Sequence, residues 1–479
     1  MRQQFSRVIV KGGVVSPGEL KIILDQAERL DLDTIAFGSR QDILFLTQNK
    51  IVDNSSSLRL VTPDGDRVEN IMSSYVTSDL FASTHWLTGD RYLYILEQFQ
   101  NTPKLKINIV DPKQRVVPLF TGHLNFIASE QEDYWYLYMR LPHWEKTQMY
   151  PVLIYSWDLA QIAEAVERIL KEEPQNVEMV FDLVIDATDL NNKTVSSPLE
   201  VDFQPFPYCE GMNRMQSGKY WLGLYWRNNK YDIKFLKGLC DLCVTSKIGK
   251  IALTPFKSFI VKGIPSEDKL AWEKFLGLSG INVRHSMLEL NWHLPVANEM
   301  ALNLKQFLVD SFNKQDISTY GLTFGIADFD QSGSYFTSIV IERNKPDVLP
   351  VEFEARASFN IVYARDFDPN TQDYIVHVQD VDQAELPALL MELSQMYFKN
   401  LGDKKPVKEV SAPKLQTIKV AVYQCNSCQT IYDYRFGDQT QNIQPGVLFE
   451  KLPNEYCCSL CEGPKENFSK ISFMAELNQ

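Results

Sequence analysis

The sequence predicts an α+β protein with a large body of two similar halves and a small C-terminal domain that binds a metal ion. Two observations lead to this prediction. A helix, a glycine-containing turn and a pair of strands are expected at residues 10–46, and the same order recurs at residues 232–264. Two C-x-x-C pairs lie near the C-terminus, at residues 425–428 and 458–461. At roughly 100–200 residues per domain, 479 residues give room for several domains.

Composition limits the classes of partner. The net charge is −13 and the pI is about 5.1, which argues against broad binding to nucleic acids or to anionic membranes. Lys11 and Gly12-Gly13 interrupt the apolar residues near the N-terminus, so a secretory signal is not expected. The sequence contains no run of about 18 apolar residues, so a membrane-spanning helix is not expected. We therefore expect a cytoplasmic protein.

The first copy of the repeated unit begins with a strong helix signal. Ser16, Pro17 and Glu19 form the pattern of a capping box with proline in the first turn. Five apolar residues then follow at helical spacing: Leu20, Ile23, Leu24, Ala27 and Leu30. A strand is expected at residues 34–37, a turn at Gly38-Ser39 and a second strand from Gln41.

The second copy predicts the same elements. A helix, a strand at 248–253, a turn and another strand follow one another. Later segments also correspond: strands at 105–110, 122–128 and 134–141 in the first half, and strands at 321–327 and 335–341 in the second. An apolar helical stripe ends each half, at 159–170 and 384–398. The predicted halves are residues 1–200 and 201–401.

Residues 402–418 are rich in Lys and Pro and lack periodicity, which predicts a linker ahead of a C-terminal domain at 419–479. That domain holds the two C-x-x-C pairs, formed by Cys425, Cys428, Cys458 and Cys461. Four thiolates at this spacing suit one tetrahedral metal ion, and the spacing alone leaves iron and zinc open. Cys457 is out of register and is expected to be a packed side chain.

The residues between the two pairs closely resemble rubredoxin. The matching positions are Tyr432-Asp433, Gly437-Asp438, Pro445-Gly446, Phe449, Leu452-Pro453 and Tyr456. The resemblance implies one iron ion, one-electron transfer and a small aromatic core of Tyr432, Phe449 and Tyr456. Gln429 and Glu462 replace the glycines that usually follow the pairs, Ser459 replaces a usual proline, and Tyr456 stands where tryptophan is common. These departures keep a zinc ribbon as the alternative.

The body resembles the siroheme-dependent nitrite and sulfite reductases. Residues 11–15 (KGGVV), Ser39-Arg40-Gln41 and 103–106 (PKLK) match the family's signatures. The resemblance implies two ferredoxin-like or siroheme-reductase-like halves, with Arg40, Lys104 and Lys106 around an anion or the carboxylates of siroheme. The alternative is that these basic residues are solvated or ion-paired.

The body also departs from that family. No cysteine lies between Cys243 and Cys425, so the family's iron–sulfur cluster lacks its usual ligands, and the first ligand segment reads RHSMLELNWHLP at 284–295. The family's Arg-Asn pair appears as Glu69-Asn70. The body is therefore expected to keep a porphyrinoid pocket without the cluster, or to serve as a docking scaffold.

Two further residue pairs are expected to have structural roles. Cys240 and Cys243 fall on a predicted helix and are expected to pack in the core. His293 and His285 lie in the lost cluster segment, where packing or hydrogen bonding is favoured over metal or siroheme ligation. No Gly-rich dinucleotide motif, P-loop or H-E-x-x-H motif is present, so the sequence gives no support for a nicotinamide or flavin site.

The favoured hypothesis is an electron carrier with a mononuclear Fe(Cys)4 site, serving a nitrite or sulfite reduction system. Its expected partners are a reductase that donates electrons and a nitrite or sulfite reductase that accepts them. One alternative is a siroheme-binding enzyme of the same class. Another is an assembly protein with a zinc knuckle.

Overall fold

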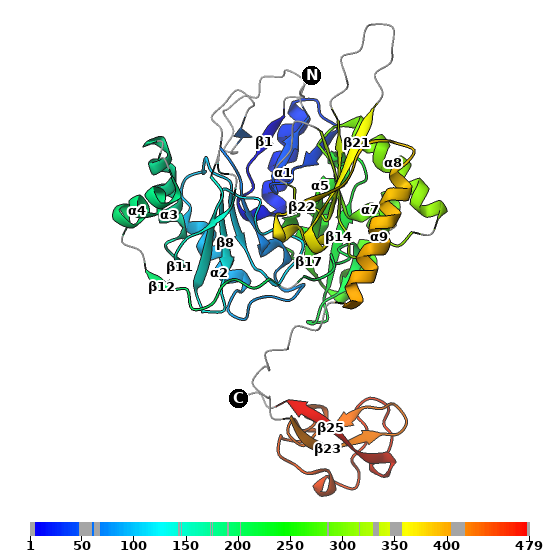
Figure 1. Ribbon diagram of the computed structural model, residues 1–479. Coiled ribbons are helices and arrows are strands. Elements are labelled where there is room, and N and C mark those ends of the chain that lie inside the picture. The colour runs from blue at the N-terminus through cyan, green and yellow to red at the C-terminus, as the bar shows by residue number, and fades with distance from the viewer. Residues whose placement is uncertain are drawn as a thin grey trace, which may run out of the picture. The chain divides into compact units, whose positions relative to one another are not determined.

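The computed structural model describes residues 5–46, 60–61, 68–141, 144, 146–172, 174, 176–188, 191–201, 203–284, 287–315, 317–328, 335–344, 357–403 and 417–476. The chain divides into two compact units, Met1–Asn400 and Leu401–Gln479, called here the body and the C-terminal domain (Figure 1). Most of the predicted linker, 404–416, lies outside the described residues. The boundary predicted between the two halves of the body stays a prediction.

Two small sheets in the body each take one strand from the other half of the sequence. The first has the order β15-β3-β4-β1-β5 and the second β13-β14-β17-β16-β2. Their strands are β1 Ser6–Val8, β2 Val14–Val15, β3 Thr34–Phe37, β4 Ile43–Phe45, β5 Leu60–Val61, β13 Gly211–Arg214, β14 Tyr220–Tyr225, β15 Tyr231–Asp232, β16 Ile251–Leu253 and β17 Ser258–Ile264. Because β15 joins the first sheet and β2 the second, the two copies share one core.

Two larger sheets show the repeat in their topology. In the first, β6, β7 and β8 are parallel and β9 and β11 follow antiparallel. In the second, β18, β19 and β20 are parallel and β21 and β22 follow antiparallel. The strands are β6 Ile71–Ser73, β7 Ile107–Val110, β8 Leu124–Ala128, β9 Tyr134–Met139, β10 Gln148–Met149, β11 Val152–Tyr155, β12 Asn192–Thr194, β18 Trp292–His293, β19 Phe324–Asp328, β20 Ile339–Arg343, β21 Ser358–Ala364 and β22 Tyr374–Asp382. This order confirms the predicted α+β class with two similar halves.

Helices cover these sheets (Figure 1). The α-helices are α1 Pro17–Arg29, α2 Gly89–Gln98, α3 Leu159–Ile169, α4 Val177–Ala187, α5 Ile233–Thr245, α6 Lys269–Leu278, α7 Met287–Leu290, α8 Glu299–Lys314 and α9 Leu386–Asp403. The short 3-10 helices of the body are η1 Lys11–Gly13, η2 Ser74–Thr77, η3 Leu170–Glu172, η4 Ser266–Asp268, η5 Arg365–Phe367 and η6 Pro369–Thr371. α2, α3 and α4 belong to the first half of the sequence, and α8 and α9 to the second.

The start of α1 shows how the sequence specifies an element. The N–H of Glu19 donates to Ser16 Oγ at 3.1 Å, and the N–H of Ser16 donates to Glu19 Oε2 at 3.0 Å. This is the predicted capping box, with Pro17 in the first turn. The strand expected from Gln41 begins later, at Ile43, because Gln41 has a left-handed φ of 60° and belongs to the turn.

The body is held together by large apolar clusters. One joins α1 and α5 to the small sheets and includes the fully buried side chains of Cys240 and Cys243. Burial raises the pKa of both thiols to about 12, so they behave as packed apolar groups, as the sequence predicts. Trp135 on β9 is buried in a second cluster and donates its Nε1–H to Ser156 Oγ. β9 therefore contributes to the core of the first half.

The C-terminal domain is a small sheet with irregular loops. Its strands, in the order β24-β23-β25, are β23 Thr417–Cys425, β24 Ile431–Tyr432 and β25 Phe468–Glu476. Its 3-10 helices are η7 Gln439–Gln441, η8 Phe449–Lys451 and η9 Lys465–Asn467. Tyr432, Phe449 and Tyr456 are buried together with Leu452, which confirms the expected aromatic core. A core of this size needs an additional stabilising link such as a bound metal ion, and the cysteine pairs lie at its edge.

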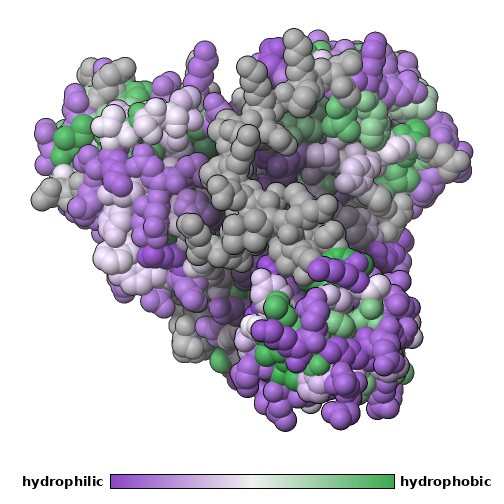
Figure 2. Space-filling model, turned by 90° about the horizontal axis from the view of Figure 1, so that it is seen from below, coloured by the Kyte–Doolittle hydropathy of each residue, from purple (hydrophilic) through white to green (hydrophobic). Residues whose placement is uncertain are grey.

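Figure 2 shows one face of the molecule, on which hydrophilic residues predominate and hydrophobic residues form small separate groups. Among the described residues, none of the helices combines the length and the apolar character needed to cross a bilayer.

Candidate metal centre

The four predicted cysteines come from two loops that the sheet brings together. Cys425 is the last residue of β23 and pairs with Phe468, the first residue of β25. Cys428 follows on the first loop, and Cys458 and Cys461 lie on the second, before β25. Asn467 ties the loops together, because its N–H group donates to the carbonyl of Pro464 and its carbonyl accepts from Asn426 N–H.

The sulfur geometry fits one tetrahedral metal ion. The Sγ atoms of Cys425 and Cys461 are 3.6 Å apart, and those of Cys428 and Cys458 are 3.4 Å apart. All four sulfurs lie within 4.8 Å of one another. Metal–sulfur bonds of about 2.3 Å at tetrahedral angles place the sulfurs about 3.8 Å apart, whereas a disulfide needs about 2.05 Å. The four cysteines form no disulfide and are arranged around one position.

Hydrogen-bond donors surround the sulfurs. The hydroxyl of Thr430 lies 3.1 Å from Cys428 Sγ, and the N–H of Thr430 donates to the same sulfur. These two bonds lower the pKa of Cys428 to about 6. For Cys458, burial opposes ionisation, but N–H groups of Leu460 and Cys461 favour the thiolate and lower the pKa. Backbone donors to sulfur stabilise negative charge, which is what a metal thiolate site requires.

The crowding of thiolates also points to a cation. The N–H of Gly463 donates to Cys461 and favours its thiolate. The sulfurs of Cys428, Cys425 and Cys458 lie beside it, however, and raise the pKa of Cys461 to about 12. A bound cation removes this repulsion and ionises all four ligands.

Two residues of this centre have unusual backbone conformations. Gln429 has φ of 63° and Glu462 has φ of 58°, both in the left-handed region. Their N–H groups donate to the carbonyls of Cys425 at 2.8 Å and Cys458 at 2.9 Å, which closes each loop around its cysteine pair. Residues other than glycine adopt this conformation at a penalty of about 1–2 kcal/mol. Both positions therefore carry local backbone strain.

Sequence reasoning missed two side chains near the sulfurs. One is Thr430, two residues after Cys428, where only its position next to the ligand loop was a signal. The other is Asn467, whose Nδ2 bonds Ser427 Oγ at 2.7 Å and lies 3.9 Å from Cys425 Sγ. Cys457 is not part of the four-sulfur group, and Gln441 Nε2 bonds its carbonyl at 2.6 Å.

Comparison with known proteins decides the family of this domain. The rubredoxin family profile matches residues 422–468. Rubredoxin-1 of Chlorobaculum tepidum is 41% identical over 51 residues, which are 11% of this chain and 74% of that protein. The probable rubredoxin HupI of Bradyrhizobium diazoefficiens is 34% identical over 74 residues, 15% of this chain and 93% of that protein.

The chain belongs to the rubredoxin family. Its membership rests on the C-terminal domain, which the matched residues occupy. Rubredoxin-2 of Alcanivorax borkumensis is 43% identical over 44 residues, and the chain spans 25% of that protein's length. Membership and the four-sulfur geometry together support an iron ion as the bound metal.

The body is similar in fold to a solved structure. The structure of the Mycobacterium tuberculosis NirA protein superposes with a TM-score of 0.62, covering 84% of this chain and 82% of that one at 13% sequence identity. This similarity shows a shared fold. It confirms the sequence-based recognition of a body of this class followed by a rubredoxin domain.

Arg40 donates three hydrogen bonds to other residues of the body. Its guanidinium donates to Asn108 Oδ1 at 2.6 Å and to the carbonyls of Asn70 and Ile107, each at 2.8 Å. Burial lowers the pKa of Arg40 to about 10, although the charges of Glu69 and Asp42 oppose this. An anion that binds at these donors would have to displace these bonds, whereas Nε of Arg40 is buried and has no hydrogen-bond partner among the described residues.

The two candidate lysines lie in different surroundings. Lys106 lies near His123, since its N–H donates to His123 Nδ1 at 3.1 Å, and both its charge and that of Arg40 act on this ring. Lys104 is exposed and lines a groove beside α3, where its N–H donates to Glu167 at 2.6 Å. The anion-binding role of Arg40, Lys104 and Lys106 stays a prediction.

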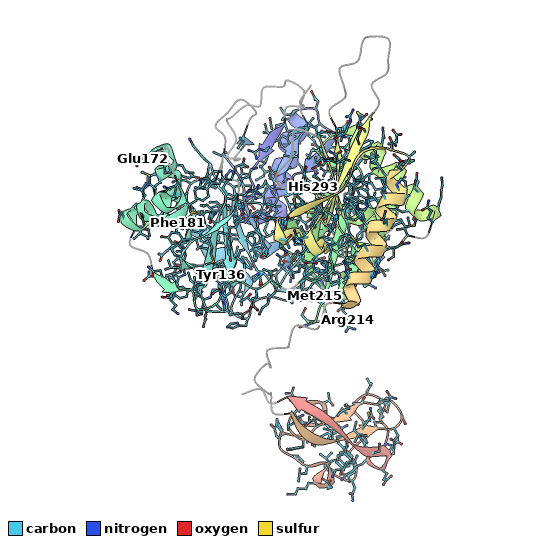
Figure 3. The ribbon with its side chains drawn as sticks, in the orientation of Figure 1. Tyr136, Glu172, Phe181, Arg214, Met215 and His293 are labelled. Atoms are coloured by element: carbon cyan, nitrogen blue, oxygen red, sulfur yellow. The ribbon has the colours of Figure 1, made fainter. Side chains whose placement is uncertain are left out.

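The positions of Asn70 and His293 are described by the structure. Asn70 is fully buried and its Nδ2 donates to the carbonyls of Val10, Arg40 and Gln41, so it joins segments of the first half. His293 lies inside the body on β18 (Figure 3), with its ring 4.5 Å from that of Phe336. Burial holds its pKa well below the usual range. His285 lies outside the described residues. Among the described residues, the four rubredoxin cysteines form the one group suited to metal binding.

Proposed function

We propose that this protein transfers single electrons through one iron ion held by Cys425, Cys428, Cys458 and Cys461. The observation that carries the proposal is the set of four sulfurs within 4.8 Å in a domain of the rubredoxin family. An iron ion bound there supplies a one-electron couple. The cysteines fill all four tetrahedral positions, so they leave no place for a substrate. The N–H groups and the Thr430 hydroxyl offset the extra negative charge of the reduced site.

The body gives this carrier its context. Its NirA-like fold and its sequence resemblance to siroheme-dependent reductases support a role in a nitrite or sulfite reduction system. We propose that the rubredoxin domain receives electrons from a reductase and passes them to a nitrite or sulfite reductase that docks on the body. Holding both units in one chain raises the effective concentration of carrier and acceptor, which favours transfer within the complex.

Metal content and colour test the proposal. Protein produced with both iron and zinc available should contain one iron per chain, absorb visible light when oxidised, and bleach with dithionite. Cys428→Ser should abolish the band, whereas Cys457→Ser should keep it, because Cys457 is outside the four-sulfur group. A colourless protein with one zinc per chain would instead support the assembly-protein alternative.

A second candidate is a siroheme-binding enzyme, favoured by the NirA-like fold. It requires a tetrapyrrole absorption band in protein produced with siroheme available, and weakening of that band in Arg40→Ala. The bonds of Arg40 to main-chain carbonyls argue against it. Absence of the band in protein that carries its iron leaves electron transfer as the function.

A further inference from the structure

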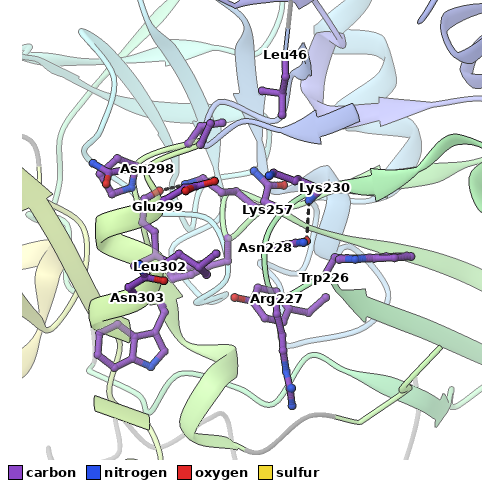
Figure 4. A pocket seen from close by; sticks show the side chains of 18 of the residues that line it. Leu46, Trp226, Arg227, Asn228, Lys230, Lys257, Asn298, Glu299, Leu302 and Asn303 are labelled. Atoms are coloured by element: carbon purple, nitrogen blue, oxygen red, sulfur yellow. Dashed lines mark hydrogen bonds between the residues drawn. The ribbon is translucent and has the colours of Figure 1, made fainter. Parts of the chain in front are cut away.

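The body contains a cavity that neither the rubredoxin centre nor the predicted anion site uses. Its volume is about 460 Å³, within the range of roughly 300–1,000 Å³ that small-molecule sites occupy. Three segments surround it: the loop between β14 and β15, the turn between β16 and β17, and the chain from β18 into α8 (Figure 4). It lies where the two halves of the sequence meet, since Phe5 and Leu46 of the first half also line it.

The walls combine an apolar surface with positive charge. The apolar part includes two indole rings and the side chains around them: Trp226, Trp292, Phe256, Leu294, Pro295, Val296 and Leu302. The cationic side chains are Arg227, Lys230 and Lys257, against the single carboxylate of Glu299. Arg227 is paired outside this set, with Glu289 at 2.6 Å. Lys230 and the protonated form of Lys257 therefore supply positive charge to the wall.

Lys257 is the unusual member. Its side chain is almost fully buried, with 7% of the residue exposed, and its Nζ donates to the carbonyl of Leu294. Burial lowers the pKa of Lys257 to about 7, opposed by the charge of Asp42. Burying an ammonium group with a neutral carbonyl as its partner is unfavourable unless an anion also binds it.

The repeat within the body shows that this fold does not need a lysine here. Gln41 occupies the corresponding place in the turn of the first copy, with φ of 60° against 59° for Lys257. Gln41 Nε2 donates to the carbonyl of Ser73, at the end of β6. Lys257 donates to Leu294, directly after β18, the strand that corresponds to β6. In the first copy, the neutral amide of Gln41 makes the equivalent hydrogen bond. The amino group of Lys257 in the second copy is therefore not needed for the fold, and we look for a separate role for it.

We propose that this cavity binds a planar aromatic anion of mononucleotide size, with its ring on the apolar wall and its anionic group at Lys257 and Lys230. Positively charged donors beside indole and phenyl rings suit a phosphate attached to a heteroaromatic ring. The proposal is independent of the electron-transfer role of the rubredoxin domain.

Equilibrium binding to the full-length protein tests this. FMN and AMP serve as probes that share a phosphate and differ in the ring, and riboflavin and inorganic phosphate each carry one part alone. Isothermal titration should show saturable binding of FMN, AMP or both at one site per chain, at least tenfold tighter than riboflavin or phosphate. The two nucleotide arms identify which ring the cavity prefers. No saturable binding of either up to millimolar concentration overturns the proposal.

The substitution Lys257→Gln tests the role of this lysine in nucleotide binding. Lys257→Gln installs the residue that the first copy carries at this turn, so the fold is expected to survive. It should weaken binding of the preferred nucleotide at least tenfold, and Lys230→Gln should weaken it less. Lys274→Gln, on the exposed face of α6, should leave affinity unchanged. Wild-type affinity in a correctly folded Lys257→Gln protein, judged by circular dichroism and the iron spectrum, contradicts the proposal.

Discussion

Gln429 and Glu462 hold the backbone of the iron loops in a conformation that glycine adopts without strain. Their φ angles are 63° and 58°, and their N–H groups close each loop onto the first cysteine of its pair. The strained conformation of each residue is part of a loop geometry that places N–H donors near the thiolates.

Gln429→Gly is expected to stabilise the iron-loaded domain modestly. Relief of about 1–2 kcal/mol of strain is opposed by the entropy lost by a glycine, about 0.5–1 kcal/mol, so the net gain is up to about 1.5 kcal/mol. Thermal loss of the iron band measures it. Ser459→Gly, in the second loop at a position without positive φ, should give no gain. Equal behaviour of the two variants would show that strain at Gln429 is negligible.

The Thr430 hydroxyl is expected to tune the iron. It lies 3.1 Å from Cys428 Sγ and stabilises the more negative, reduced site. Thr430→Val should therefore lower the reduction potential by tens of millivolts, where about 59 mV corresponds to a tenfold change for one electron. Spectroelectrochemistry measures the shift. Thr440→Val is the matched control, because that hydroxyl bonds Asp438 instead of a sulfur, and its potential should not move.

Among the elements, the loop between β7 and β8 carries His123, whose titration makes the stability of the body depend on pH. His123 Nδ1 accepts the N–H of Lys106, and burial with the nearby charge of Lys106 lowers its pKa to about 4. The ordinary value is about 6.5. Between these two pH values the unfolded chain binds a proton that the folded chain does not, so stability falls as pH drops from about 6.5 to about 4.

His123→Asn is expected to shift acid unfolding of the body to lower pH. The asparagine oxygen can still accept from Lys106 but does not titrate, so this contribution to acid unfolding disappears. Circular dichroism between pH 7 and pH 3 follows the transition. His85→Asn, at an exposed histidine, should leave the midpoint in place. A midpoint unchanged by both substitutions would mean that other groups alone control acid unfolding.

The elements also show what the sequence could and could not predict. The capping box of α1 and the four metal cysteines follow from local spacing, and both are found as expected. The exchange of β2 and β15 between sheets, the bonds of Arg40 to main-chain carbonyls and the place of Lys257 beside a cavity depend on contacts between distant segments. Periodicity and motifs carry no information on such contacts, so only the folded chain reveals them.

At the scale of the whole molecule, the two units have different sources of stability. The body has large apolar clusters, whereas the rubredoxin domain has a small aromatic core and depends on its metal. Iron removal should therefore unfold the C-terminal domain and leave the body folded. Calorimetry of the chain with and without iron should show a low-temperature transition that moves on metal loss and a body transition that does not. Loss of both transitions together would show that the body depends on the metal.

The central claim is that the four sulfurs hold one iron ion that gains and loses a single electron. A coulometric titration of the intact protein, followed by its visible band, measures this directly. The band should bleach completely after uptake of one electron per iron and return fully on reoxidation. A protein that takes up no electrons over the accessible potential range, or that contains zinc in place of iron, would contradict the claim.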